Sequence, residues 1–500
     1  MIVDMHLHPR PVEDYRDGGA ELLARAAAVG IDVLIASDLG TRWAPYPDSA
    51  AVREANARLR ELARRCAPRL RYLVYLNPQN PDWPEVLAEH AASACGVKLW
   101  ISCRDPETGS LDAARAVLAE AGRRDLTVLL HVFDRTEPRD LPGELDLEAF
   151  FELAGACPQT RMIAAHSGGG NWRRVAGRFR RYPNTWGDVS GCYPERGMVE
   201  TLVRENGADR ILYGSDATGR SFSSQLAKVF FADLTPEERG LVLGGNARRL
   251  FKLDDFSLGV PPAGREVLPY PDFSEDHFVF IGSWPYRDCR VDPAELAREL
   301  AAAGVRRAYA ADLDAFHADR AAGNAAMLAA AKRFPVFRPL CVIDPASEAE
   351  LAALDPAFAG VWFSPYLAGR AVDDPRFDGV FARCAERGIP IWLNCGFGDF
   401  RFRRPDLAVR PVEPGELAAR MARSSACRCV VQGWDRFDDT VKRAPAGWRF
   451  ECSRLGDGEF RARDYYADGD PAKIVSGSEY PLRDYGSVIA SLTGRFPALR

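Results

Sequence analysis

Short apolar runs alternate with longer amphipathic stretches through the first half of the chain, and this alternation limits the fold more than any other feature. The runs predict eight strands, at Ile2–Met5, Asp32–Ser37, Leu70–Leu76, Gly96–Trp100, Thr127–Leu130, Met162–Ala165, Asn184–Val189 and Arg210–Tyr213. Between them, stretches such as Ala20–Val29 and Ala51–Cys66 repeat apolar residues at three- and four-residue steps, as helices do. Eight strand–helix pairs in about 250 residues is the size of one (β/α)8 barrel, or TIM barrel. We therefore expect an α/β fold of this type.

The second half of the 500-residue chain resembles the first. A stretch with four prolines, glycines and charges follows the first barrel, which is typical of a linker. Beyond it, Gly360–Phe363 corresponds to Gly96–Leu99, and Lys473–Glu479 corresponds to Arg210–Asp216. Self-similarity over so long a period indicates duplication. The expected domains are a barrel at 1–253, a linker at 254–275 and a second, degenerate TIM-barrel-like domain at 276–500.

Composition excludes several classes of protein. A net charge of −5 does not indicate the excess of basic residues that is typical of nucleic-acid-binding proteins. No stretch approaches the ~18 uncharged apolar residues of a membrane-spanning helix. The first residues show neither the basic region nor the cleavage site of a secretory signal. The twelve cysteines have no paired spacing, as expected for reduced thiols. We expect a cytoplasmic protein that binds neither nucleic acid nor a membrane.

Four of the seven histidines lie at the carboxyl ends of predicted strands in the first half. His6 and His8 are two residues apart in one strand, so their side chains share a face. His131 and His166 each follow an apolar run directly, and Asp216 ends the eighth predicted strand. Active sites of this fold gather at the carboxyl ends of the strands. We expect these five residues to converge. His90, inside a helical stretch, is expected on the surface.

Neutral imidazoles that converge with a carboxylate suit a divalent metal, most readily Zn²⁺, with Mn or Fe as alternatives. Such an ion lowers the pKa of its bound water to about 7 and so supplies hydroxide at neutral pH. Asp216 would orient that water or take its proton. A histidine next to the metal would polarise the substrate or act as general acid. This is the chemistry of a hydrolase.

The first 253 residues resemble the amidohydrolase superfamily, in the branch of the aminocarboxymuconate-semialdehyde decarboxylase-like proteins. The motifs that carry the resemblance are spread along this half, at Asp4–Pro9, Leu76–Pro81, Ala165–Gly170, Tyr213–Asp216 and Gly245–Phe251. The resemblance implies that His6, His8, His131 and Asp216 bind one metal. It also implies that His166 is a catalytic group beside the metal.

Lys98, in the fourth predicted strand, leaves the number of metals open. In binuclear members of the superfamily a strand-four lysine is carboxylated and bridges two metals, and His166 then becomes a ligand. The mononuclear branch often has a lysine here that contacts substrate instead. We expect one metal, with two as the alternative if Lys98 is carboxylated. A structural ion pair is the remaining alternative for the role of Lys98.

Arginine and aromatic residues follow several strands on the face where substrate should bind. Among them are Arg10, Arg42 and Trp100. Arginine suits a carboxylate, and an aromatic ring suits a flat or apolar body. A small organic acid is therefore a plausible substrate.

The second half lacks a comparable set of ligands. When Phe278–Pro285 is aligned with Ile2–Pro9, His6 and His8 correspond to Gly282 and Trp284. The other site residues of the first half also have counterparts: Trp362 for Lys98, Asn394 for His131, Gly433 for His166 and Glu479 for Asp216. A catalytic metal generally needs three protein ligands. We therefore expect a pseudoenzyme domain that forms an internal pseudo-dimer with the first barrel. A homo-oligomer of whole chains is a further expectation.

The expected activity is metal-dependent hydrolysis of a C–N or C–O bond, in an amide, cyclic amide, lactone or ester. The alternative is a metal-dependent non-oxidative decarboxylase, because the same ligand set supports both reactions in this branch. A third hypothesis is a non-catalytic binding or scaffold protein, in which both barrels are inactive.

Overall fold

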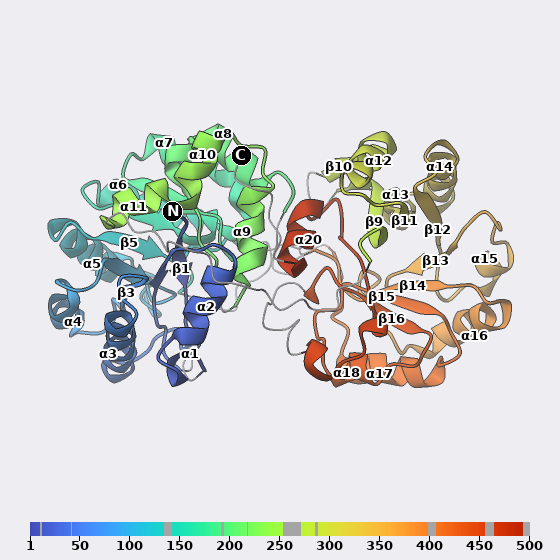
Figure 1. Ribbon diagram of the computed structural model, residues 1–500, viewed down its shortest axis with the longest axis horizontal. Coiled ribbons are helices and arrows are strands. Elements are labelled where there is room, and N and C mark those ends of the chain that lie inside the picture. The colour runs from blue at the N-terminus through green and yellow to red at the C-terminus, as the bar shows by residue number, and fades with distance from the viewer. Residues whose placement is uncertain are drawn as a thin grey trace. The chain divides into compact units, whose positions relative to one another are not determined.

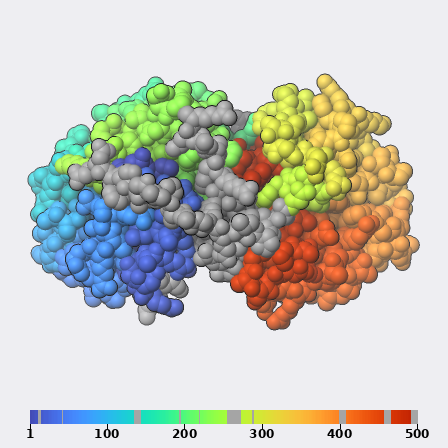
Figure 2. Space-filling view, in the orientation of Figure 1, coloured from blue at the N-terminus to red at the C-terminus, as the bar shows by residue number. Residues whose placement is uncertain are grey.

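The computed structural model describes residues 1–10, 13–41, 43–134, 143–191, 195–217, 219–253, 272–285, 289–398, 407–455 and 465–493. These residues form two compact units. Unit 1 covers the described residues up to Leu253, and unit 2 covers those from Asp272 to Thr493. Unit 1 runs from blue to green, and unit 2 from yellow-green to red (Figure 1, Figure 2). Most of the stretch expected as a linker lies outside the described residues.

Unit 1 contains an eight-stranded parallel sheet in which the strands follow chain order. They are β1 (Val3–Leu7), β2 (Val33–Ala36), β3 (Leu70–Leu76), β4 (Gly96–Leu99), β5 (Thr127–Leu130), β6 (Met162–Ala164), β7 (Thr185–Asp188) and β8 (Ile211–Leu212). The sheet closes because the N–H of Asp216 donates to the carbonyl of His6 at 2.7 Å, and that of His8 to the carbonyl of Ala217 at 2.5 Å. The expected TIM barrel is confirmed.

Helices surround the strands of unit 1 (Figure 1). They are α1 (Glu13–Arg16), α2 (Ala20–Ala28), α3 (Ser49–Arg65), α4 (Trp83–His90), α5 (Asp112–Arg123), α6 (Leu147–Ala156), α7 (Arg178–Arg181), α8 (Met198–Asn206), α9 (Phe222–Phe230), α10 (Pro236–Gly240) and α11 (Asn246–Phe251). Their apolar faces pack on the strands in one large core. A second core joins strand residues such as Ile35, Leu73 and Leu129 to Phe251 of α11. Because Leu129 and His131 share a face of β5, this core supports the residues at the strand ends.

Unit 2 contains a nine-stranded sheet. Its strands are β9 (Glu275–Trp284), β10 (Cys289–Val291), β11 (Arg307–Asp312), β12 (Phe337–Val342), β13 (Gly360–Phe363), β14 (Ile391–Asn394), β15 (Cys429–Gln432), β16 (Trp448–Glu451) and β17 (Ile474–Val475). Eight of them are parallel, and β10 alone pairs antiparallel, with the end of β9. The N–H of His277 donates to the carbonyl of Ser476, and that of Phe280 to the carbonyl of Tyr480, both at 3.0 Å. The first and last strands therefore meet, as in unit 1.

The helices of unit 2 follow its strands in the same alternation. They are α12 (Pro293–Ala302), α13 (Leu313–His317), α14 (Arg320–Arg333), α15 (Glu348–Ala352), α16 (Asp378–Arg387), α17 (Pro414–Arg423), α18 (Asp439–Lys442) and α20 (Tyr485–Thr493). The buried side chains form a core of their own that is rich in aromatic rings, among them Phe280, Trp362 and Trp448. No described helix of either unit is long and apolar enough to cross a membrane.

Matching hydrogen bonds show how the two barrels correspond. In unit 1 the carboxylate of Asp4 accepts from the N–H of His6 and from the N–H of a serine that follows β8. In unit 2 the carboxylate of Asp276 accepts from the N–H of Phe278 and from that of the serine that follows β17. Asp276 therefore holds the place of Asp4, and Phe278 the place of His6.

This correspondence corrects one part of the expected alignment. His6 and His8 correspond to Phe278 and Phe280, four residues before the expected Gly282 and Trp284. The alignment relied on matching prolines, but β9 continues past the barrel, where Gly282 and Trp284 pair with β10. The other corresponding positions expected from the sequence agree with the strand registers. For example, Trp362 of β13 holds the place in unit 2 that Lys98 of β4 holds in unit 1.

Candidate metal centre

The site of unit 1 begins at the carboxyl end of β1. The alternation of a strand places His6 and His8 on one face, and both side chains are buried. Asp4 fixes this strand to the loop after β8 by accepting from backbone N–H groups on both. Asp216, in that loop, adopts a left-handed backbone with φ of 57°. The strand and the loop thus hold three candidate metal ligands in fixed positions.

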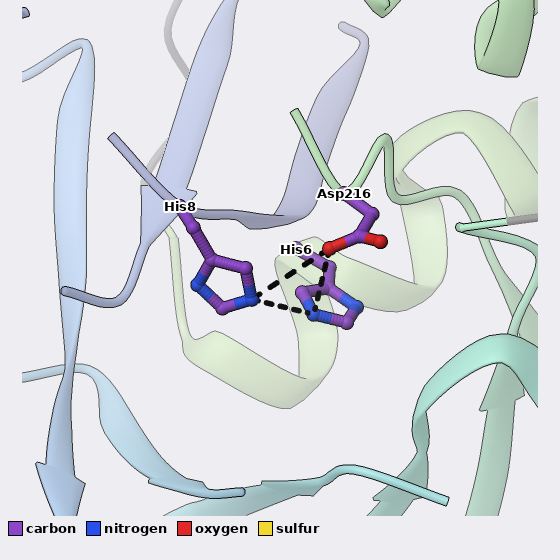
Figure 3. Close-up of side chains that lie close together, drawn as sticks. All are labelled: His6, His8 and Asp216. Atoms are coloured by element: carbon purple, nitrogen blue, oxygen red, sulfur yellow. Dashed lines mark hydrogen bonds and ion pairs between the residues drawn. The ribbon is translucent and has the colours of Figure 1, made fainter. Parts of the chain in front are cut away.

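The three side chains point toward one another (Figure 3). The Nε2 atoms of His6 and His8 lie 3.3 Å apart. Oδ1 of Asp216 lies 3.9 Å from Nε2 of His6 and 3.7 Å from Nε2 of His8. These atoms form one of two groups of His, Cys, Asp or Glu in the described residues that are close enough to hold a metal ion.

The hydrogen bonds of Nδ1 in His6 and His8 determine whether Nε2 of each ring has a lone pair for a metal. Nδ1–H of His8 donates to the carbonyl of Ser37 at 2.9 Å, because a carbonyl can only accept. Nδ1 of His6 lies 2.8 Å from Oδ2 of Asp188, which is again an acceptor. Each neutral ring therefore presents the lone pair of Nε2 to the centre. Two neutral nitrogen donors that face each other at 3.3 Å, with a carboxylate beside them, form a donor set that fits a divalent metal.

The rings are neutral because they are buried. Burial and then the charge of Lys98 lower the pKa of His6 well below its usual range. Burial, Lys98 and His6 do the same to the pKa of His8. Since a metal ligand must be the unprotonated imidazole, no proton has to leave either ring before an ion binds.

Lys98 extends from β4 into the same site. Its side chain is fully buried, and Nζ lies 3.1 Å from Nε2 of His6. Burial lowers the pKa of Lys98 to about 8, although the carboxylates of Asp216 and Asp188 oppose the shift. In this arrangement the lysine donates to the imidazole that the metal would use.

His166 lies beside His6 in a left-handed turn after β6, with φ of 60°. The two ring centroids are 5.2 Å apart. Its Nδ1 lies 3.2 Å from the carbonyl of Ser190 and so carries the hydrogen. Burial and then His6 and His131 lower the pKa of His166 well below its usual range. His166, His6 and Asp188 form the second group of candidate ligands.

His131 lies close to the site but belongs to neither group in the described residues. Its ring centroid is 5.2 Å from that of His166, whereas its Nε2 lies 2.9 Å from Oε1 of Glu144. The ring also stacks on Phe133, with centroids 6.2 Å apart. A carboxylate on one imidazole nitrogen leaves the other nitrogen for a metal.

Of the residues expected to contact substrate, Trp100 lies beside these histidines. The ring of Trp100 is 6.4 Å from that of His131 and 6.2 Å from that of Trp43. Arg10 forms an ion pair with Asp14 at 3.0 Å. Arg42 lies outside the described residues. His90, expected on the surface, is instead buried and hydrogen-bonded to a tyrosine hydroxyl of β3 at 2.9 Å.

The sequence analysis missed Asp188, Ser190 and Glu144. Asp188 ends β7 just as Asp216 follows β8, so the rule that strand ends carry the chemistry would have found it. Ser190 lies two residues further on, and its hydroxyl is 3.0 Å from Nδ1 of both His6 and His166. Glu144 follows β5 in a loop, where no sequence pattern indicated it.

The corresponding positions of unit 2 offer a different chemistry. Phe278 and Phe280 replace the histidines of β1, and Glu479 holds the place of Asp216 with the same left-handed backbone, φ of 58°. Glu479 is fully buried and forms ion pairs with Arg454 at 3.0 Å and Arg483 at 2.8 Å. Burial raises the pKa of Glu479, but the two arginines outweigh it and lower the pKa. Within the described part of unit 2, no group of side chains is close enough to hold a metal.

Comparison with known proteins places this site in a family. The family model described as amidohydrolase matches residues 3–253, half of the chain. The chain belongs to the amidohydrolase family. The match spans the candidate metal ligands of β1 and of the loop after β8, which belong to unit 1 of this amidohydrolase. No curated protein gives a significant match.

Solved structures similar to this amidohydrolase cover about half of it. A 2,6-dihydroxybenzoate decarboxylase from Rhizobium is 20% identical over 51% of this chain and 99% of its own, with a TM-score of 0.41. A 5-carboxyvanillate decarboxylase from Sphingomonas paucimobilis is 12% identical over 51% and 99%, with a TM-score of 0.38. A dihydroorotase from Campylobacter jejuni is 14% identical over 51% and 84%, with a TM-score of 0.37.

Proposed function

We propose that unit 1 is a metal-dependent hydrolase that cleaves a C–N or C–O bond in a small organic substrate. One observation carries the proposal. The unprotonated Nε2 atoms of His6 and His8 face each other at 3.3 Å, and a carboxylate oxygen of Asp216 lies within 3.9 Å of both. Buried lone pairs that converge in this way are stabilised by a cation, and the side chains of unit 1 support a divalent one.

Asp216, His166 and Lys98 would have different roles in hydrolysis. A divalent ion held here would supply a Lewis acid that activates water at neutral pH. Asp216 is 24% exposed and accessible to that water, so it would accept the proton. His166 carries its hydrogen on Nδ1, which leaves Nε2 to accept a proton or to bind substrate. Lys98 would stabilise negative charge that develops on the substrate.

We propose one ion, most readily Zn²⁺, because imidazole nitrogens suit zinc and a carboxylate completes the set. An unmodified Lys98 would act on the site as a hydrogen-bond donor, with its Nζ 3.1 Å from Nε2 of His6. Carboxylation of Lys98 would instead create a bridging ligand and a place for a second ion. Mn or Fe remain alternatives to zinc.

Metal content of the purified full-length protein tests this proposal. We expect about one equivalent per chain, and its loss in a variant that carries His6→Ala and His8→Ala. Two equivalents would point to a carboxylated Lys98. If the protein contains no metal and takes none up on addition, the enzyme proposal is wrong, and a non-catalytic binding or scaffold role becomes the better account.

An organic acid is the proposed substrate. The rings of Trp43, Trp100 and Phe133 lie next to the histidines and form a wall on which a flat substrate could rest. Trp43 is 38% exposed, which is unusual for so large an apolar side chain. Lys98, with Nζ 3.1 Å from Nε2 of His6, is a cation that could pair with a carboxylate of the substrate, whereas Arg10 would first have to leave Asp14.

Decarboxylation is the second candidate, favoured by the buried Lys98 next to His6 and by the aromatic rings next to the histidines. An apolar site that binds a carboxylate favours its loss as neutral CO₂. Isotopes separate the two reactions once a panel of esters, lactones, amides and unsaturated acids yields a substrate. Hydrolysis in H₂¹⁸O places ¹⁸O in the product, whereas decarboxylation in D₂O releases CO₂ and places deuterium on carbon.

We further propose that unit 2 acts as an internal partner of unit 1, in the manner of a pseudo-dimer. The repeated hydrogen bonds around Asp4 and Asp276 support a common architecture, and the replaced histidines support a role without a metal. Residues 1–253 expressed alone should lose solubility or metal-dependent activity. A fully folded and fully active fragment would contradict this role. Whether full chains also pair with each other can be measured by light scattering.

A further inference from the structure

Asp188 is a fully buried carboxylate at the end of β7 that accepts from four donors. Its Oδ2 lies 2.8 Å from Nδ1 of His6. Its Oδ1 accepts from the N–H of His166 at 2.8 Å, from the N–H of Ser190 at 2.9 Å and from the hydroxyl of Ser190 at 2.6 Å. With these partners, the carboxylate is better suited to orient neighbouring groups than to bind an ion itself.

Unit 2 shows which of these contacts belong to the fold. Glu451 ends β16 in the place of Asp188 and accepts from the N–H of Gly433 at 2.7 Å. It also accepts from the N–H and the hydroxyl of Ser453, at 2.7 and 3.0 Å. These contacts match those that Asp188 makes to His166 and Ser190. They hold the turn after the sixth strand, whether or not a histidine lies there.

The contact to His6 is the one that unit 2 does not repeat. The position of His6 is taken by Phe278, whose ring has no polar atom to donate. The acidic residue at this strand end therefore accepts hydrogen bonds from the backbone of the neighbouring turn in both barrels. In unit 1 it also contacts the imidazole of His6. This contact exists only where the candidate metal ligands exist.

We propose that Asp188 is a positioning residue for the metal centre, an inference that rests on the proposed function. It holds the hydrogen of His6 on Nδ1, so that Nε2 keeps its lone pair for the ion. It also fixes the backbone of His166. The hydroxyl of Ser190 donates to Asp188 and lies 3.0 Å from Nδ1 of both histidines, so one acidic side chain orients both rings.

Lys98 gives this orientation a physical consequence. Its ammonium lies 3.1 Å from Nε2 of His6 and can only donate. With the hydrogen on Nε2 instead, His6 would direct an N–H at the lysine, and the ligand would be lost. Carboxylates that orient metal-binding histidines commonly contribute 10- to 100-fold to metal affinity.

The test compares Asp188→Asn with Glu451→Gln in the full-length protein. Zn²⁺ affinity is measured by competition with a chromophoric chelator, and folding by circular dichroism. We expect Asp188→Asn to bind Zn²⁺ roughly 10- to 100-fold more weakly than the unmodified protein, and Glu451→Gln to bind it normally. Equal affinity in both variants would show that Asp188 has only the backbone role. Absence of Zn²⁺ binding by the unmodified protein would reject the proposed function instead.

A second measurement needs neither metal nor a stable variant. Proton–nitrogen spectra of ¹⁵N-histidine-labelled, metal-free protein report which ring nitrogen of His6 carries the hydrogen, with the signal assigned by its loss in His6→Ala. We expect the hydrogen on Nδ1 in the unmodified protein, and Asp188→Asn, where it folds, to shift the population toward Nε2. A hydrogen on Nε2 in the unmodified protein would overturn the proposal, even if the protein binds no metal.

Discussion

At the scale of single residues, the site depends on acceptors that touch the outer edges of the histidine rings. The carbonyl of Ser37 and the carboxylate of Asp188 each hold a hydrogen on Nδ1, so that the opposite nitrogens face the centre. The spacing of His6 and His8 could be predicted, because a strand alternates its side chains. The acceptors could not, because they come from other strands and carry no motif.

A glycine near the site gives a prediction at this scale. Gly191 has φ of +82°, and a Cβ there would lie 2.3 Å from Nδ1 of His166 and 3.1 Å from Oδ2 of Asp216. Gly197 has a similar φ of +75° but open space around it. We expect Gly191→Ala to weaken Zn²⁺ binding at least tenfold and Gly197→Ala to leave it unchanged.

The matched pair separates crowding from backbone strain. A left-handed alanine costs about 1 kcal/mol in either position, so both variants should lose a similar amount of stability from strain alone. Thermal unfolding measures that loss, and chelator competition measures the metal. Equal Zn²⁺ affinity in the two variants would mean that His166 and Asp216 tolerate the displacement.

At the scale of elements, the strand and helix pattern could be predicted more completely than its registers. The strands of unit 1 begin and end within two residues of the expected positions, because alternating periods identify each element. The register of β9 was missed by four residues. Its ten residues exceed the length of a barrel strand, and hydrophobicity alone does not say which part of a long apolar strand lies in the barrel.

The capping box of α10 gives a prediction for one helix. The side chain of Thr235 accepts from the N–H of Glu238, and the carboxylate of Glu238 accepts from the N–H of Thr235 at 2.9 Å. Loss of such a cap typically costs about 1 kcal/mol. Thr235→Ala should lower the free energy of unfolding by this amount, and Thr235→Ser should retain most of it. Urea unfolding measures both, and metal affinity should not change.

The end of β16 gives a prediction about pH. Burial raises the pKa of Glu451 to about 7 from an ordinary value of 4.5. The folded protein therefore holds this proton more tightly than the unfolded chain. The resulting stabilisation is complete below about pH 4.5 and is lost as the pH rises through 7. A shift of this size corresponds to about 3 kcal/mol.

Glu451→Gln isolates this effect, because glutamine is neutral at every pH. Urea unfolding at pH 5 and pH 8, with a chelator present, should show that the unmodified protein exceeds the variant in stability by more at pH 5 than at pH 8. The opposite order would mean that Glu451 is ionised in the folded protein at both values.

At the scale of the whole molecule, two barrels with separate cores lie in one chain, and only one has a candidate metal centre among the described residues. The size of the chain and its internal likeness predicted two such units. The residues of unit 2 that correspond to His6 and His8 could not be predicted correctly from the sequence. The register expected for β9 was wrong by four residues, so Phe278 and Phe280 were not recognised at these positions.

Calorimetry tests this division of roles. Ligand binding stabilises the folded form by about 2.7 kcal/mol when the free ligand exceeds its Kd a hundredfold. For a unit of this size that corresponds to roughly 5–10 °C in Tm. Zn²⁺ should therefore raise the Tm of one unfolding transition and leave the other in place, and His6→Ala should abolish the change. An equal shift of both transitions would contradict a metal site confined to unit 1.

The buried ion pairs of Glu479 bear on whether a metal centre could be built at the corresponding place in unit 2. Returning histidines at Phe278 and Phe280 would restore two ligands, but the carboxylate that should join them is already neutralised by Arg454 and Arg483. An incoming dication would meet two guanidinium groups in a site with little water to screen them. Each of the four positions would have to change before any one change helped. The charges around Glu479 therefore oppose metal binding at this place in unit 2.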